Sequence, residues 1–228
     1  IDRMTTYTQL LANCPIVKNE MNRFSQYPIG YSFNTVCIGA NIKTTLDQIG
    51  AHHVRLNLSE KPIHDKHQSE WEKILSIRFC HFANSSAAPP GHSALVLSSI
   101  SHYTDWQEFA VDSDEYHTPA YEQKKKEICK TMIAKAETII PGLSAAITYC
   151  DMSTPLTIRR WTAAPLGGRS GGYYATPGMI SRFLSEESSI RNLYFAGQFA
   201  TGRQGVNGAL QSGKCTAALI LGDKKLGK

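Results

Sequence analysis

The sequence lacks the features that would place the protein in a membrane, secreted or zinc-binding class. No apolar run approaches the roughly 20 residues that a membrane-spanning helix needs, and no signal peptide opens the chain. The six cysteines stand far apart without a C-x-x-C pair, which favours buried thiols in a reducing compartment over a zinc knuckle or a disulfide framework. We expect a cytoplasmic protein, with association at a membrane surface left open.

Hydrolase and nucleic-acid-binding signals are also missing. No serine stands in a G-x-S-x-G string, and no cysteine has a recognisable nucleophile context. The net charge of +5 is modest, and the lysines are mostly scattered along the chain. This distribution is typical of a solvated surface rather than of a nucleic-acid-binding patch. His64 and His67 have a metal-ligand spacing, but they lie in a polar stretch without a second cysteine or glutamate site, so we expect a surface loop and no metal.

The overall amino-acid composition is typical of a globular protein with a substantial core. The chain has 228 residues, of which 42% are hydrophobic and 19% charged. Apolar and polar side chains alternate with the period of a half-buried strand in four stretches, 31–39, 53–58, 77–82 and 94–97. Turn-forming residues separate the last two stretches. The middle of the protein is therefore predicted to be a mostly antiparallel sheet.

A helix and a further strand follow this sheet. Apolar residues between 121 and 140 recur at helical spacing, and Pro141 with Gly142 ends the predicted helix. A strand over 146–148 is expected to run into residues 153–161, where Trp161 would pack between strands.

The C-terminal quarter contains a string that resembles a phosphate-binding loop. More than half of the seventeen glycines lie between residues 167 and 213, and residues 208–215 read G-A-L-Q-S-G-K-C, one residue from GxxxxGK[ST]. Cys215 replaces the hydroxyl residue that would hold magnesium, and a thiol is a poor ligand for so hard a cation. Gly213 and Lys214 are also predicted to lie inside a continuous helix. A nucleoside-triphosphate site is therefore not expected.

A different interpretation starts from the preceding residues. A short strand over 192–197 would end at Gly197, and residues 205–209 would open a helix running to Leu221. The free N–H groups and the positive dipole at the start of a helix attract an electron-rich group. The pyrimidine edge of a flavin is such a group.

Together these stretches resemble a known family. Asn192-Leu-Tyr-Phe-Ala-Gly-Gln followed by Gly205-Val-Asn-Gly-Ala-Leu-Gln-Ser-Gly resembles the C-terminal flavin signature of the phytoene desaturase, carotenoid isomerase and retinol saturase group. These FAD-dependent oxidoreductases are related to the amine oxidases. The likeness is strong over residues 141–221, where it includes 153–168, and looser over about 31–140, where it includes 87–95.

The resemblance implies a mixed α/β fold, the C-terminal half of a two-domain flavoprotein. Residues 1–150 would form part of the substrate domain, with an antiparallel sheet and helices. Residues 151–228 would form the C-terminal strand, loop and helix of a Rossmann-like FAD-binding domain. The G-x-G-x-x-G string that binds the ADP half of FAD in the family is absent from this sequence. We therefore expect a second chain to supply that N-terminal half, while a processed product or a fragment remains an alternative.

The resemblance also implies the site residues. Gly197 and Gln198 would lie at the ribityl and phosphate part of FAD. Arg159 and Arg160 would lie near the flavin or face solvent. Tyr173 and Tyr174 would line the substrate cavity or pack in the core. The residues expected at the pyrimidine edge are Gly205, Val206, Asn207, Gly208 and Ala209.

The expected function is that of one half of an FAD-dependent oxidoreductase. It would act by hydride transfer on C–H or C=C bonds of an apolar polyene or terpenoid-like substrate, in a desaturation, saturation or isomerisation. Because the cofactor would carry the chemistry, we name no general base. The alternative is a non-catalytic assembly subunit that keeps the flavoprotein fold.

Overall fold

The chain divides into two compact units in the computed structural model. One unit comprises residues 33–155, and the other combines residues 1–32 with residues 156–228. The structure describes residues 3–24, 31–57, 74–110, 117–168, 188–197, 200 and 205–222. The sequence suggested one boundary near residue 150 and placed residues 1–32 in the first domain. The structure groups residues 1–32 with the C-terminal segment, because their buried side chains pack against residues 190–195.

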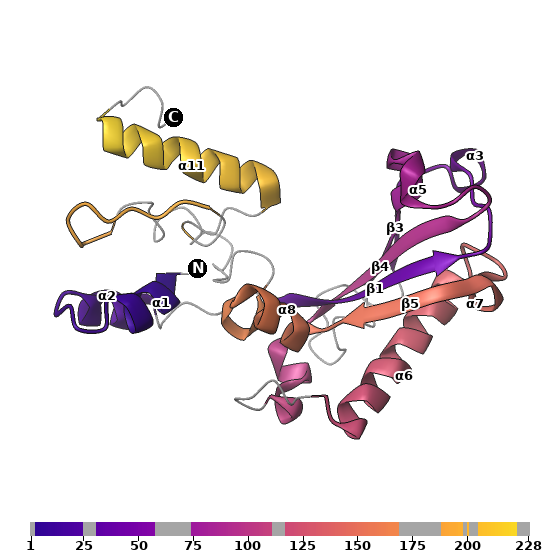
Figure 1. The fold of residues 1–228 in the computed structure, drawn as a ribbon, viewed down its shortest axis with the longest axis horizontal. Helices are drawn as coiled ribbons and strands as arrows, with labels where there is room; N and C mark the ends of the chain where they lie inside the picture. The colour runs from indigo at the N-terminus through magenta and orange to yellow at the C-terminus, as the bar shows by residue number, and fades with distance from the viewer. Residues whose placement is uncertain are drawn as a thin grey trace. The chain divides into compact units, whose positions relative to one another are not determined.

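The unit of residues 33–155 contains both helices and strands (Figure 1). Its elements are β1 (Ser32–Ala40), α3 (Leu46–Ile49), β2 (His53–Asn57), β3 (Ile74–Phe79), α5 (Cys80–Ala83), η2 (Ser85–Ala87), β4 (Ser93–Ser101), η3 (Tyr103–Asp105), η4 (Gln107–Phe109), α6 (Pro119–Ala136), α7 (Leu143–Ala146) and β5 (Ile147–Ser153). The described elements of the other unit are α1 (Arg3–Thr5), η1 (Thr6–Leu10), α2 (Val17–Phe24), α8 (Pro155–Thr162), η5 (Pro165–Gly167) and α11 (Gly205–Leu221).

A five-stranded sheet organises residues 33–155, in the order β2-β3-β4-β1-β5. The pairs β2–β3, β3–β4 and β1–β5 are antiparallel. Side chains alternate between buried and more exposed positions along β1 and β4, as the period-2 pattern predicts. Val36, Ile77 and Leu97 are fully buried. The predicted mixed α/β fold with an antiparallel sheet is confirmed.

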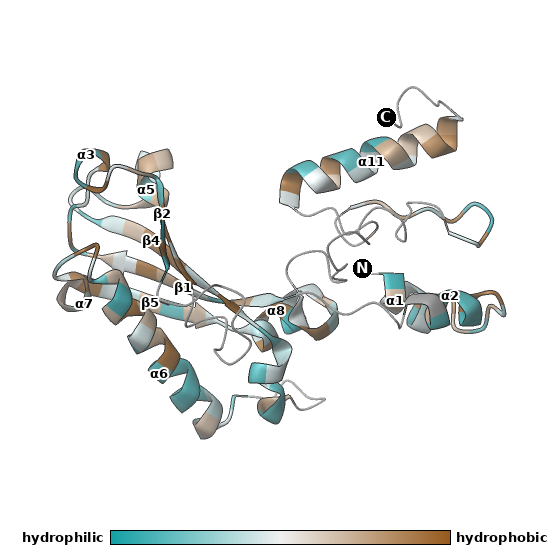
Figure 2. Ribbon diagram, turned by 180° about the vertical axis from the view of Figure 1, so that it is seen from behind, coloured by the Kyte–Doolittle hydropathy of each residue, from teal (hydrophilic) through white to brown (hydrophobic). Residues whose placement is uncertain are grey.

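Helix α6 covers this sheet with one apolar face. The Thr118 hydroxyl caps the helix by accepting a hydrogen bond from the Tyr121 N–H at 3.2 Å, and Pro119 occupies the first turn. The buried residues of α6 are Tyr121, Ile128, Met132 and Ala136, and the helix packs on β3 and β4. Apolar and polar positions alternate along α6 (Figure 2). The predicted helix is confirmed, although it ends at Ala136 rather than Ile140.

Two stretches differ from the strands predicted for them. Strand β3 covers Ile74–Phe79, and the chain then turns into α5 at Cys80, so the predicted strand over 77–82 was placed too late. Residues 155–162 form α8 rather than a continuation of β5. Trp161 lies on this helix with 78% of its surface exposed, so its predicted packing between strands is wrong. Arg159 and Arg160 are also exposed.

The hydroxyl of Ser93, the first residue of β4, joins this strand to the segment that follows β1. Ser93 is 1% exposed, and its Oγ donates to the Ile42 carbonyl at 2.7 Å. The Thr44 N–H donates to the same oxygen at 3.2 Å, and the Thr44 hydroxyl lies 2.9 Å from it. His81 Nε2 lies 3.0 Å from the Thr44 hydroxyl. One buried hydroxyl thus forms hydrogen bonds with polar groups of residues 42 and 44, which are distant from Ser93 in the sequence.

Replacing Ser93 should destabilise the unit of residues 33–155. In Ser93→Ala the Ile42 carbonyl and the Thr44 N–H lose a buried partner, and we expect the free energy of unfolding to fall by about 1–3 kcal/mol. Urea denaturation followed by circular dichroism measures this change. Ser98→Ala on the half-buried face of the same strand is the control, and equal effects of the two substitutions would contradict the anchoring role.

Helix α11 confirms the prediction made for Gly213 and Lys214. Both lie in the middle of the helix, and Cys215 is buried in it. A phosphate-binding loop would place the lysine at the start of a helix, so this geometry contradicts a triphosphate site. Outside the neighbouring backbone of its own helix, no atom of the part of the chain that the structure describes lies within 4 Å of the position that a Gly213 Cβ would occupy.

Gly213→Ala should therefore stabilise the protein. Alanine has the higher helix propensity, and we expect about 0.5–1 kcal/mol of added stability because the new methyl group meets open space. A thermal melt of the variant beside the wild type checks this. Loss of stability would show that the helix packs closely at this glycine.

Candidate functional site

Two hydroxyl groups of α11 hold the segment that precedes it. The Ser212 Oγ accepts a hydrogen bond from the Gly197 N–H at 3.2 Å. The Thr216 Oγ1 donates to the Phe195 carbonyl at 2.9 Å and lies at the same distance from the Ser212 carbonyl within its own helix. Ser212 is fully buried. The backbone of residues 195–197 therefore lies against the face of α11 that carries Ser212 and Thr216.

Gly197 and Gly205 give the backbone conformations that the site requires. Their φ angles are +99° and +73°, in the left-handed region that favours glycine. At both positions the described residues place no atom within 4 Å of where a Cβ would be, apart from the glycine's own chain neighbours. Among the described residues, nothing therefore fills the place of a side chain at the end of the 193–197 segment or at the start of α11.

The first turn of α11 is accessible and partly apolar. Gly205, Val206 and Asn207 are exposed, and 76% of the Val206 surface is accessible. Gly208 and Ala209 are half-buried. The N–H groups of a first helical turn have no partner within the helix, and they carry the positive end of the helix dipole. The backbone N–H groups of this turn can donate hydrogen bonds to an electron-rich carbonyl edge, and no charged side chain is needed.

Side chains of the N-terminal segment pack against residues 190–195, a contact that the sequence did not indicate. The ring of Tyr7 is fully buried and meets the ring of Phe195 edge to face at 5.7 Å. The Arg3 guanidinium lies 4.1 Å from the Phe195 ring centroid and donates to the Ala200 carbonyl at 3.3 Å. Residues packed around Tyr7 and Val17 include Met4, Leu11, Cys14, Met21, Ile190, Leu193 and Phe195.

A carboxylate joins the same two segments. The Tyr7 hydroxyl donates to Glu20 Oε2 at 3.1 Å, and the Ser189 hydroxyl donates to Glu20 Oε1 at 2.5 Å. Burial raises the pKa of Tyr7 to about 12, with the Arg3 charge opposing the shift and the Glu20 charge adding to it. Tyr7 is therefore a neutral hydrogen-bond donor in the core rather than a proton-transfer group.

The structure describes only some of the predicted site residues. It places Gly205, Val206, Asn207, Gly208 and Ala209 together in the first turns of α11. Gln198, Tyr173 and Tyr174 lie outside the described residues, and so do His64 and His67. The strand predicted over 192–197 is reduced to a single bridge at Tyr194. A strand needs a neighbouring strand, and the described residues of this unit contain none.

Sequence reasoning missed Ser212, Thr216 and Arg3. The signal available for the first two was the pair of hydroxyl residues four positions apart on one helix face. No sequence signal pairs Arg3 with Phe195, because their contact joins the two ends of the chain.

The part of the chain that the structure describes contains neither a metal-binding cluster nor a membrane-spanning helix. Within the described residues, no group of three or more His, Cys, Asp or Glu side chains could hold a metal ion. Among the helices that the structure describes, none combines the length and apolar character needed to cross a bilayer. Cysteine burial differs from expectation, because Cys215 is buried whereas Cys37 and Cys150 are exposed.

Two of the relatives align with nearly the whole chain, and a third aligns with about half of it. The chain is 27% identical to a chloroplastic prolycopene isomerase of Arabidopsis thaliana over 99% of its own length and 36% of the relative's. The chloroplastic prolycopene isomerase of Daucus carota is 25% identical, over 97% and 34% of the two lengths. An all-trans-retinol 13,14-reductase of Danio rerio is 28% identical over 48% of this chain and 18% of that protein. The chain thus spans about a third of the length of the prolycopene isomerases.

A solved structure and a family model complete the comparison. An oxidoreductase from Methanosarcina mazei superposes with a TM-score of 0.46 and 12% identity, over 90% of this chain and 37% of that one. The family model described as flavin containing amine oxidoreductase matches residues 50–221, which include α11 and the Gly197 and Gly205 backbone. The chain therefore belongs to the family of flavin containing amine oxidoreductases.

Proposed function

We propose that this chain is part of an FAD-dependent oxidoreductase that acts on C–H or C=C bonds of an apolar polyene or terpenoid-like substrate. The alignment of nearly the whole chain with prolycopene isomerases carries the proposal. The retinol reductase among the relatives supports a conjugated, apolar substrate class. The reaction would be a desaturation, a saturation or an isomerisation.

The start of α11 fits the isoalloxazine edge of a flavin. The Gly205, Val206 and Asn207 backbone is exposed at the positive end of a 17-residue helix, and Gly208 and Ala209 continue the turn. No charged side chain occurs in the first turn, so the donors are backbone groups. FAD bound there would supply hydride transfer, the chemistry that no side chain of this site provides.

The Gly197 backbone would adjoin the ribityl and phosphate part of the same cofactor. Its left-handed conformation leaves open space where a side chain would stand, and its N–H is held by Ser212. Gln198 follows directly and would offer an uncharged amide beside the phosphates. Ser212 and Thr216 would keep this backbone in place without touching the cofactor.

The unit of residues 33–155 would hold the substrate. Its sheet and α6 form a separate core, and the family model covers most of this unit as well as α11. Tyr173 and Tyr174 would line the substrate cavity. A dry, apolar cavity would exclude water from the reacting bond, which suits a polyene.

We further propose that a second chain completes the FAD site. The G-x-G-x-x-G turn that holds the pyrophosphate in dinucleotide-binding folds is absent from these 228 residues. A Rossmann-like fold also needs a sheet beside its helices. A partner carrying the first strand, turn and helix would supply both.

The flavin site can be tested at Gly205. Valine is a β-branched residue that adopts positive φ only with strain of about 1–2 kcal/mol, so Gly205→Val should lower flavin affinity about tenfold or more. The measurement is the flavin content of the purified complex, from its visible absorbance and its bleaching by dithionite. Gly213→Ala in the same helix is the matched control and should keep the flavin content of the wild type. Equal flavin content in both variants would show that the start of α11 is not part of the flavin site. A colourless wild-type complex would favour the alternative, a non-catalytic assembly subunit.

The need for a partner can be tested by reconstitution. We expect the isolated 228-residue chain to bind FAD weakly and the mixture with a candidate N-terminal subunit to bind it tightly, because the pyrophosphate contacts come from the second chain. Fluorescence quenching of FAD on titration with each sample measures this. Tight FAD binding by the chain alone would refute the partner requirement while leaving the flavin site intact.

A further inference from the structure

Two cysteines from different elements meet at the edge of the sheet in the unit of residues 33–155. Cys129 lies on α6 and Cys150 on β5, and their sulfur atoms are 3.5 Å apart although 21 positions separate them in the chain. Both are free thiols. A disulfide has sulfurs about 2.05 Å apart, so the two atoms need to approach by roughly 1.5 Å. This distance lies within the reach of side-chain rotation and a small shift of an edge strand.

A groove gives small molecules access to both sulfurs. It has a volume of about 600 Å³ and lies between α6 and β5, with α7 also contributing to its wall. Cys129 and Cys150 both line it, together with Lys125, Lys126 and Asp151. Cys150 is exposed and Cys129 is half-buried. A reagent entering the groove therefore meets both cysteines, of which Cys150 is the more exposed.

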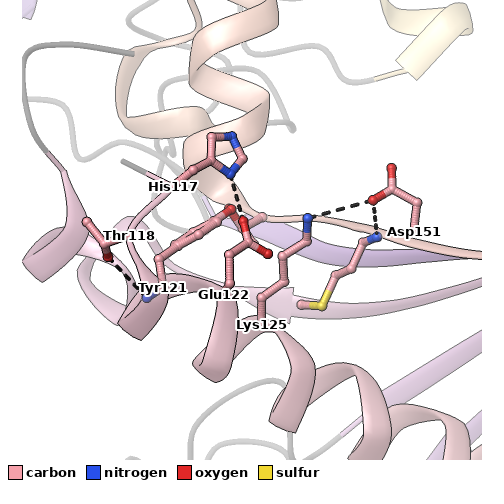
Figure 3. A network of polar contacts seen from close by, with 8 residues as sticks. His117, Thr118, Tyr121, Glu122, Lys125 and Asp151 are labelled. Carbon is pink, nitrogen blue, oxygen red and sulfur yellow. Dashed lines mark hydrogen bonds and ion pairs between the residues drawn. The ribbon is translucent and has the colours of Figure 1, made fainter. Parts of the chain in front are cut away.

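Lys125 and Asp151 bridge the same two elements close to the sulfur pair. Lys125 extends from α6 towards β5, where its Nζ lies 3.7 Å from Asp151 Oδ1 (Figure 3). The lysine side chain is only 18% exposed. α6 and β5 are thus already held together beside the cysteines, and a covalent bond would join elements that do not need to move far.

We propose that Cys129 and Cys150 form a reversible disulfide, a redox modification site that cross-links α6 to β5, with hydrogen peroxide as its oxidant. The Cys150 thiolate attacks a peroxide oxygen, the O–O bond breaks, and hydroxide leaves to become water as Cys150 becomes a sulfenic acid. The Cys129 sulfur then attacks the Cys150 sulfur, the S–S bond forms, and the hydroxyl leaves with the Cys129 proton as a second water. Two thiols lose two electrons and two protons, and one peroxide is reduced to two waters.

The order of attack follows from the environments of the two sulfurs. Burial, then the hydrogen bond and the charge of Cys150, and last the charge of Asp151, raise the pKa of the Cys129 thiol to about 12, while the charge of Lys125 opposes the shift. Cys129 therefore holds its proton, and Cys150, which is the more exposed of the two, is the first nucleophile. When Cys129 attacks the sulfenic acid, the hydroxyl that leaves Cys150 takes up the Cys129 proton, and the nearby Lys125 ammonium favours the loss of that proton. Cys129 is then the resolving thiol.

The disulfide would restrain the helix that covers the sheet. It would close a loop containing the second half of α6, the 137–142 turn, α7 and the first half of β5. Cross-linking a loop of this length removes conformational freedom from the unfolded chain. We expect oxidation to raise the Tm of this unit by about 5–10 °C, and a reductant to reverse the rise. This inference concerns the unit of residues 33–155 alone and does not rest on the proposed function.

The test is oxidation of the 228-residue chain with hydrogen peroxide, followed by alkylation, proteolysis and mass spectrometry without reduction. We expect a cross-linked peptide pair containing Cys129 and Cys150, lighter than the two thiol peptides by two hydrogens. Cys150→Ser should leave Cys129 alkylatable after the peroxide treatment. Cys129→Ser should instead trap a sulfenic acid on Cys150 that reacts with dimedone. Circular dichroism of each variant checks that the sheet is folded.

A matched control uses Cys37, which is exposed on β1. Cys37→Ser should leave the Cys129–Cys150 cross-link and the rise in Tm unchanged. The proposal is overturned if peroxide links other cysteines in preference to this pair. It is also overturned if folded wild-type chain takes up oxygen on these sulfurs without a disulfide, or if the Tm rise persists in Cys129→Ser.

Discussion

The candidate flavin site depends on two hydrogen bonds, one that the Ser212 hydroxyl accepts and one that the Thr216 hydroxyl donates. They attach the backbone of Gly197 and Phe195 to the face of α11, although 15 and 21 positions separate the bonded residues in the chain. Ser212 is fully buried, so the loss of its hydroxyl would leave the Gly197 N–H without this partner in a desolvated position. In the candidate site, the face of a helix therefore holds the backbone of residues 195–197 in place.

The two units achieve stability by different means. Residues 33–155 bury an apolar sheet face under α6, with fully buried side chains such as Ile77 and Leu97. The described residues of the other unit contain no sheet, and they hold together through the small apolar cluster around Tyr7 and Val17 together with aromatic and polar contacts. Arg3 over Phe195, and Tyr7 with Glu20, are examples. Membership of the flavin containing amine oxidoreductase family connects both units, because the matched region, residues 50–221, extends across them.

The differences between expectation and structure share a cause. The stretch 77–82 has the alternation of a strand, but the chain turns at Cys80, where Phe79 stacks on Phe82 with ring centroids 4.9 Å apart. Residues 155–162 contain β-favouring types and still form a helix, which leaves Trp161 exposed beside Arg160. The 192–197 stretch has strand propensity but no described strand beside it. In each case the outcome depends on a neighbour that the local sequence does not specify.

The sequence by itself determined what depends on local periodicity and on glycine. Alternation predicted the antiparallel sheet, helical spacing predicted α6, and the spacing from Gly205 to Leu221 placed Gly213 and Lys214 inside a helix. These features follow from short-range geometry, which the order of residues encodes directly. Only the tertiary structure decided which distant groups meet: Arg3 with Phe195, Ser212 with Gly197, and Cys129 with Cys150. These contacts join residues that are distant in the chain, and no local pattern records the path by which the backbone brings them together.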